Sequence, residues 1–154
     1  MSSNSWNGFH FRAYRPADFP RLCELDQVCF SEDVAYAPGE IALALAQPET
    51  FAVVAEHGEE VVAFVLALQR RRVLGHIITI DVHPKFRRHG IGDRLMELAE
   101  QRLREQGATR LILEVGIYNE PAIAFYGGRG FVRQRVLPRY YRDGSDAYLM
   151  EKAL

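Results

Sequence analysis

The stretch Thr79–Gly92 constrains the fold more than any other part of this 154-residue chain. It leaves an apolar run, turns at Pro84, passes a basic segment and reaches two glycines, Gly90 and Gly92. Apolar side chains then recur at helical spacing, which predicts a helix over about 90–106. The first main-chain N–H groups of a helix lack partners within it and lie at the positive end of its dipole. A strand, a basic turn and a helix in this order therefore favour a phosphate site.

The glycine spacing of this turn differs from that of two common phosphate loops. No Gly-Lys-Ser/Thr follows, as in nucleotide hydrolases, and the Gly-x-Gly-x-x-Gly of dinucleotide-binding folds is absent. The pattern is instead Arg87-x-x-Gly90-x-Gly92 after a strand that ends in Val82-x-Pro84. Taken alone, it is equally compatible with a glycine turn that carries a solvated cluster of basic side chains.

The composition indicates a single domain, because 154 residues with 48% hydrophobic side chains can build a substantial core. A formal net charge of −1 gives no bulk attraction to nucleic acid or to an anionic membrane, so neither partner is expected. Cys23 and Cys29 match no zinc spacing and no disulfide framework, which predicts free thiols, a cytoplasmic location and no metal site. Residues 1–7 are predicted to be a flexible leader before one domain over residues 8–154.

Hydrophobic periodicity predicts an α/β fold with a mixed, mostly antiparallel sheet of seven strands and about four helices. The expected strands are residues 9–13, 51–56, 61–68, 73–82, 111–115, 131–136 and 147–152. The expected helices begin at Pro16, Pro38, Gly90 and Asn119. The unit from 73 to 115 is expected to be a right-handed parallel crossover, with the other strand pairs antiparallel.

Two acidic residues, Asp81 and Glu114, stand inside otherwise apolar strands. An ionised carboxylate in such a place is costly unless it is paired or hydrated. If the two strands are neighbours that diverge toward their C-terminal ends, both carboxylates reach one water-accessible slot, where ligands of α/β sheets bind. The alternative is that each is a structural acid bonded to the main chain or to an arginine.

A second motif runs from Leu113-Glu114-Val115 through Asn119, Ala122 and Tyr126 to Gly130-Phe131. Together with the Arg87–Gly92 turn, it resembles the acetyl-CoA-binding halves of the GNAT superfamily of N-acetyltransferases, whose element order the chain shares. The segment from Arg139-Tyr140-Tyr141 to Met150 is similar to the C-terminus of RimI-like (ribosomal-protein alanine) N-terminal acetyltransferases. The resemblance implies a GNAT fold, with the central parallel pair splayed at the cofactor site, and acetyl-CoA as the co-substrate.

The same resemblance implies roles for individual residues. Glu114 is expected to be the general base, and Tyr126 the acid that protonates the coenzyme A sulfur. The expected cofactor-binding residues are Ile80, Asp81, Val82, Arg87, Arg88, His89, Gly90, Ile91, Gly92, Asn119, Ala122 and Tyr126. The expected substrate-binding residues are Tyr36, Asp81, Tyr140 and Tyr141. Attraction of a cationic amine by Asp81 is inferred from its charge alone, and packing roles remain open for Tyr126 and the tyrosine pair.

The sequence thus predicts an N-acetyltransferase that acts on a protein or peptide N-terminal amine. Gly116, Tyr118 and Asp81 depart from the RimI-like pattern near the acceptor slot, which leaves the acceptor open. One alternative is acetylation of a small amine (a polyamine, an amino acid or an antibiotic), for which the pocket near Tyr36 and Tyr140 would be closed. Another is a non-catalytic acyl-CoA-binding module that regulates a partner. Monomer and homodimer are both compatible with the sequence.

Overall fold

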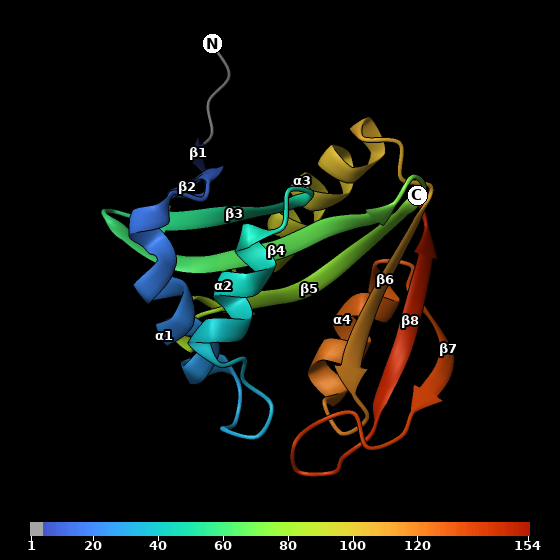
Figure 1. The fold of residues 1–154 in the computed structure, drawn as a ribbon. Helices are drawn as coiled ribbons and strands as arrows, with labels where there is room; N and C mark the ends of the chain where they lie inside the picture. Colours follow the sequence, from blue (N-terminus) through green and yellow to red (C-terminus); the bar gives the residue numbers. More distant parts are fainter. Residues whose placement is uncertain (1–4) are drawn as a thin grey trace.

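The computed structural model describes residues 5–154, which form a mixed sheet with helices on both faces (Figure 1). The strands are β1 (Ser5–Trp6), β2 (Phe9–Ala13), β3 (Thr50–His57), β4 (Glu60–Arg71), β5 (Leu74–Val82), β6 (Arg110–Gly116), β7 (Val132–Leu137) and β8 (Ala147–Ala153). The helices are α1 (Phe19–Cys29), α2 (Pro38–Ala46), α3 (Ile91–Glu105) and α4 (Glu120–Gly128), with short 3-10 turns at Pro16–Asp18 and Pro84–Phe86. None of these helices is long and apolar enough to cross a membrane.

The strand order is β1-β2-β3-β4-β5-β6-β8-β7, and β5–β6 is the parallel pair that the sequence predicted. The sheet has eight strands where seven were predicted, because Ser5–Trp6 pairs with β2. Trp6 packs edge-on against Phe11 with ring centroids 6.1 Å apart, and this contact anchors a segment that was predicted to be flexible. Residues 1–4 of that predicted leader lie outside the described residues.

Strands β5 and β6 diverge along their length, as Figure 1 shows. Their pairing covers only Leu74–His76 against Arg110–Ile112. Beyond this point β5 stays paired with β4 as far as Val82, and β6 stays paired with β8 as far as Gly116. The facing edges of β5 and β6 therefore have no strand partner in their C-terminal halves.

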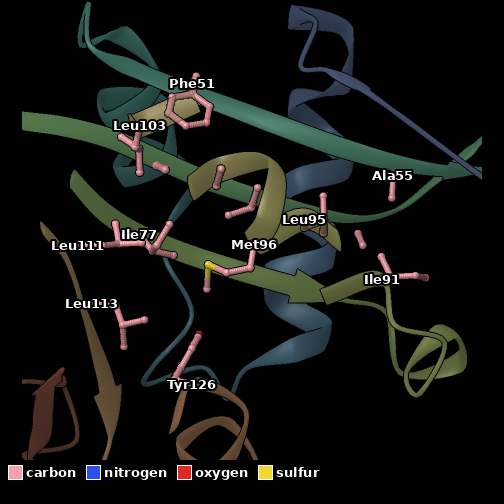
Figure 2. Close-up of a cluster of buried hydrophobic side chains, with 14 of the residues drawn as sticks. Phe51, Ala55, Ile77, Ile91, Leu95, Met96, Leu103, Leu111, Leu113 and Tyr126 are labelled. Carbon is pink, nitrogen blue, oxygen red and sulfur yellow. The ribbon is translucent and has the colours of Figure 1, made fainter. Parts of the chain in front are cut away.

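Two hydrophobic cores hold the sheet, one on each face. Figure 2 shows the larger core, in which α3 packs Leu95, Met96 and Leu103 against the sheet and against α4. The smaller core joins α1 to the other face through Leu22 and Leu25. Because α3 buries an apolar face with 3–4-residue spacing, its first turn and the loop before it are held in a fixed position.

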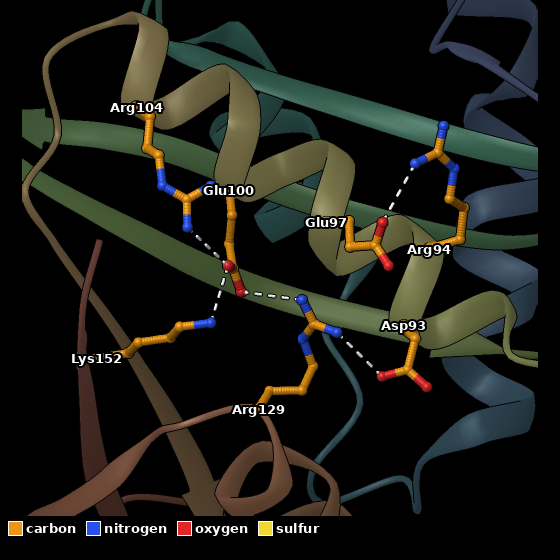
Figure 3. A network of polar contacts seen from close by, with 7 residues as sticks. All are labelled: Asp93, Arg94, Glu97, Glu100, Arg104, Arg129 and Lys152. Atoms are coloured by element: carbon orange, nitrogen blue, oxygen red, sulfur yellow. Dashed lines mark hydrogen bonds and ion pairs between the residues drawn. The ribbon is translucent and has the colours of Figure 1, made fainter.

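A buried acid ties α3 to the C-terminal part of the sheet (Figure 3). The Glu100 side chain is 3% exposed, and its carboxylate lies 2.9 Å from Lys152 Nζ on β8. Arg129, which follows α4, and Arg104 on α3 each place a guanidinium nitrogen 3.5 Å from the same carboxylate. This cluster connects the elements on both sides of the β5–β6 divergence.

Candidate active site

The predicted phosphate turn lies at the start of α3. Gly90 is the N-cap and has φ +78°, a left-handed conformation that favours glycine. A Cβ at this position would lie 2.7 Å from the Trp6 indole, so the close approach of Trp6 also requires glycine. Since Gly90 has no side chain to cap the helix, the first-turn N–H groups remain available for an anion. That the main chain of Arg88–Gly92 holds a phosphate stays a prediction.

Side chains of the same turn support the loop itself. Arg87 Nε donates to the Val82 carbonyl oxygen at 3.0 Å, and the His89 ring nitrogen Nδ1 lies 3.0 Å from the carbonyl oxygens of Phe86 and Arg87. The rings of Phe86 and His89 pack against Phe9 on β2, with centroids 5.9 and 6.0 Å away. The rings of Phe86 and His89 therefore brace the turn against the sheet.

Glu114 lies on β6 beyond the end of the β5–β6 pairing, with a side chain that is 14% exposed. Its Oε1 is 2.8 Å from His76 Nε2 on β5. His76 Nδ1 in turn accepts a hydrogen bond of 3.0 Å from Arg70 Nε on β4. The carboxylate therefore has a hydrogen-bond partner and also reaches water. Both reduce the desolvation free energy of a charge in an apolar strand.

Tyr36, Tyr140 and Tyr141, which the sequence predicted to bind the substrate, all lie near Glu114. Burial and the nearby Glu114 carboxylate raise the pKa of Tyr141 to about 12, and the same two causes, in the same order, raise the pKa of Tyr140. The pKa of Tyr36 is raised by burial, then by Tyr140 and Glu114. All three hydroxyls therefore stay protonated at neutral pH and can act as hydrogen-bond donors.

The tyrosines come from two loops that face each other across the open end of the divergence. Tyr36 lies between α1 and α2, and the T-shaped pair Tyr140–Tyr141 lies between β7 and β8, with centroids 5.0 Å apart. Arg142 joins these loops: it donates to the carbonyl oxygens of Glu32, at 3.0 Å, and Ala35, and its Nη1 is 3.3 Å from Glu40 Oε1. The two walls of the site are therefore tied together.

Tyr126 projects from α4 toward β5, where Figure 2 shows it beside Met96. Its side chain is buried, with 8% of the residue exposed. Burial raises the pKa of its hydroxyl, and the nearby Asp81 and Tyr141 raise it further. Tyr126 thus has a packing role and also carries a protonated hydroxyl toward the divergence between the strands.

The prediction that the Asp81 carboxylate shares an open slot with Glu114 is wrong. Asp81 is 1% exposed and accepts a 2.6 Å hydrogen bond from Thr79 Oγ1. A bulge at the Leu66/Ala67 register shift changes which β5 side chains face α1, and it places Asp81 against the fully buried Asp26 of that helix. Burial and the hydrogen bond with Asp26 raise the pKa of Asp81 well above its ordinary value. A carboxyl that is buried and bonded to Thr79 does not reach a cationic amine in the slot.

Asn119 and Ala122 form the start of α4. Asn119 Oδ1 accepts a 3.3 Å hydrogen bond from the Ala122 main-chain nitrogen, the usual geometry of an N-cap. The amide nitrogen of Asn119 has no such role and remains a donor. The structure therefore gives the two residues a helix-capping function, and their contact with a cofactor stays a prediction.

Sequence reasoning missed four residues near the site: Arg70, His76, Asp26 and Arg142. Two of them carried a readable signal. His76 is a polar residue within the apolar run of β5, and Asp26 stands four residues after Leu22 on the apolar stripe of α1. Arg142 and Arg70 carried none, because their partners are distant in sequence or depend on strand register.

The fold agrees with the comparison to known proteins. Residues 19–131, most of the chain, match the acetyltransferase (GNAT) family. The chain belongs to this family. Ard1 from Thermoplasma volcanium is 30% identical and superimposes with a TM-score of 0.88 over 96% of this chain and 98% of that one. An N-alpha-acetyltransferase of Sulfurisphaera tokodaii is 42% identical over 81 residues, which are 52% of this chain and 48% of the relative.

The chain spans about half the length of the curated relatives it matches. The ribosomal-protein-S18-alanine N-acetyltransferase of Escherichia coli shares the GNAT fold, with 23% identity and a TM-score of 0.83 over 94% of this chain and 93% of that one. Within this family member, an uncapped helix start, a partnered carboxylate and a protonated tyrosine gather around one divergence between strands. That set of groups can accept and donate protons beside a phosphate-bearing ligand.

Proposed function

We propose that this GNAT family member is an acetyl-CoA-dependent N-acetyltransferase whose acceptor is the α-amine of a protein or peptide N-terminus. The observation that carries the proposal is the position of the Glu114 carboxylate at the open end of the β5–β6 divergence, among three protonated tyrosines. The N-alpha-acetyltransferase activity in the name of the S. tokodaii relative supports the same reaction. A cytoplasmic location is part of the proposal, in keeping with the free thiols of Cys23 and Cys29.

Two features fit acetyl-CoA, which supplies the acetyl group as a thioester. The uncapped first turn of α3, with Gly90 in a left-handed conformation, suits the diphosphate of the coenzyme. The unpaired edge of β5 between Thr79 and Val82 offers main-chain groups to the amides of an extended pantetheine arm. Arg88–Gly92 would hold the diphosphate, and Ile80 and the Asn119 amide would hold the arm.

Glu114 and Tyr126 would handle the two protons of the reaction. An amine attacks only when it is neutral, so Glu114 accepts a proton from the acceptor nitrogen. The Tyr126 hydroxyl, which its raised pKa keeps protonated, donates a proton to the departing sulfur. The main chain of β5 orients the acetyl carbonyl, and this positioning lowers the entropic part of the barrier.

A small amine remains the second candidate acceptor because of one observation. Arg142 bridges the two loops that carry Tyr36 and Tyr140 and holds them together at the mouth of the site. A mouth held in this way suits a compact amine, whereas a peptide N-terminus must enter end-first between the tyrosines. The acceptor is therefore decided by measurement of turnover with both classes.

The test measures thiol release from acetyl-CoA with a panel of peptides of varied N-terminal residue, polyamines and amino acids. N-terminally blocked peptides that contain lysine are the matched controls for α-amine specificity. We expect turnover with free peptide N-termini and a loss of about 100-fold or more in kcat/KM for Glu114→Gln, since a general base contributes at least this much. Calorimetric affinity for acetyl-CoA should be unchanged in that variant. Failure of the folded wild-type protein to take up acetyl-CoA would contradict the proposal.

A further inference from the structure

His76 occupies an unusual place for a titratable residue. It lies on the paired half of β5, in the run Leu74–Ile80, and is only 7% exposed. Both of its ring nitrogens have partners, Glu114 Oε1 at 2.8 Å from Nε2 and Arg70 Nε at 3.0 Å from Nδ1. A buried histidine with a charged partner on each side is not required for packing, since an aliphatic residue fills the same space.

The two partners fix the tautomer of the ring. A guanidinium has hydrogen-bond donors and no acceptor, so His76 Nδ1 must be the accepting, unprotonated nitrogen. A ring of this kind carries its hydrogen on Nε2, which therefore donates to Glu114. The assignment follows from the identity of the partners. The result is a chain of two hydrogen bonds in one direction, from Arg70 through His76 to the Glu114 carboxylate.

We propose that His76 and Arg70 are positioning residues for Glu114, an inference that rests on the proposed function of Glu114 as a general base. The Nε2–H group holds one carboxylate oxygen, which fixes the rotamer of Glu114 and leaves lone pairs for the acceptor amine. No proton travels along the chain, because His76 donates the same hydrogen before and after Glu114 accepts a proton. Arg70 prevents the tautomer change that would turn a lone pair of Nε2 toward the carboxylate.

The other titratable groups around Glu114 do not replace this support. Tyr36 approaches from the α1–α2 loop, and Tyr140 and Tyr141 from the β7–β8 loop, and the raised pKa of each keeps its hydroxyl neutral. Arg70 on β4 is a cation, and it is linked to Glu114 through His76. Loss of the donor at His76 should therefore make the Glu114 carboxylate bind its proton more tightly.

The test compares His76→Leu with His76→Gln, whose amide can accept from Arg70 and donate to Glu114. For His76→Leu we expect kcat/KM to fall about 10- to 100-fold, the effect of one hydrogen bond to a charged group. The midpoint of the ascending limb of its pH profile should move to higher pH, with the acetyl-CoA affinity unchanged. His76→Gln should recover most of the rate. Arg70→Leu should resemble His76→Leu in a milder form, and Arg71→Leu, at the exposed neighbouring position, should match the wild type.

A second measurement keeps the inference independent of turnover. Long-range ¹H–¹⁵N correlation spectra of the resting wild-type protein report which ring nitrogen of His76 is protonated, and they require no acetyl-CoA. We expect His76 to be protonated at Nε2 alone in the wild type. In Arg70→Leu we expect both ring tautomers to be populated. Protonation at Nδ1 in the wild type would overturn the inference even if the protein is an acetyltransferase. An unmoved pH midpoint with near wild-type kcat/KM in His76→Leu would overturn it too.

Discussion

At the scale of single residues, the molecule separates two acids that the sequence made look alike. Glu114 is partnered by His76 and reaches water, whereas Asp81 is buried against Asp26. Asp26 Oδ1 and Asp81 Oδ2 have no other hydrogen-bond partner among the described residues, so one proton between the two carboxyls satisfies both oxygens. The first acid is suited to proton transfer, and the second holds α1 onto β5.

This difference predicts how stability depends on pH. Burial and Asp26 raise the pKa of Asp81 above 3.8 in the folded protein, so the folded state binds more protons than the unfolded state above that pH. The contribution of Asp81 to the free energy of unfolding is complete below about pH 4. It is lost as pH rises through the folded pKa, and the free energy of unfolding falls by at most roughly 1.4 kcal/mol per pH unit. We expect Asp81→Asn to remove this slope, so the variant gains stability relative to the wild type as pH rises.

Denaturant unfolding between about pH 4.5 and pH 8 measures the slope. Asp33→Asn, which changes an exposed carboxyl in the loop after α1, is the matched control and should keep the wild-type slope. An identical pH dependence in Asp81→Asn and the wild type would show that Asp81 is ionised in both states.

At the scale of elements, two loops that are far apart in the sequence form the walls of the site. The α1–α2 loop and the β7–β8 loop lie side by side at the lower edge of Figure 1, and Arg142 is the residue that bridges them. Arg142 bonds to the main-chain carbonyl oxygens of Glu32 and Ala35, so the bridge depends on the conformation of the α1–α2 loop. Arg142 therefore contributes to the spacing of the two loops.

Removal of this bridge should weaken acceptor binding more than it slows the chemical step. For Arg142→Ala we expect a several-fold rise in the acceptor KM, with kcat and acetyl-CoA affinity little changed, because the mouth loses its preorganised shape. Hydrogen exchange of residues 32–35 should become faster in the same variant. Arg135→Ala, an exposed change on β7, serves as the control. A fall in kcat at constant acceptor KM would assign Arg142 to the chemical step instead.

The elements also show which parts of the site a sequence can predict. The turn before α3, the Asn119 cap and the Glu114 position are readable because each depends on neighbours within a few residues. The Arg142 bridge spans more than 100 residues, and the Asp26–Asp81 contact depends on a bulge in β5 that shifts the side chains between faces. Contacts of this kind come from register and packing, which single-sequence patterns do not encode.

At the scale of the whole molecule, the strand divergence that forms the site also weakens the sheet. Only three residues of β5 pair with β6, so the two halves of the sheet need another connection. Glu100 supplies it, since its buried carboxylate meets Lys152 of β8 and Arg129 after α4 (Figure 3). Helix α3 thus begins at the glycine turn and, through Glu100, connects the two halves of the sheet.

Loss of the Glu100 charge should therefore destabilise the whole fold. For Glu100→Gln we expect a decrease of roughly 3 kcal/mol in the free energy of unfolding, because cations gathered around a buried acid lose their partner. Glu97→Gln, which removes an exposed ion pair with Arg94 on the same helix, should change it by less than about 0.5 kcal/mol. Guanidinium unfolding measures both. Equal midpoints for the two variants would refute a joining role for Glu100.

The contact between Trp6 and Gly90 gives the protein its own optical reporter. Trp6 is the chain's single tryptophan, and its indole rests on the glycine at the start of α3. Light emitted by this ring depends on the polarity and charge beside it, so a dianion that settles on the neighbouring amides alters the emission directly. Occupancy can then be followed in the unlabelled native chain, separately from any catalytic event.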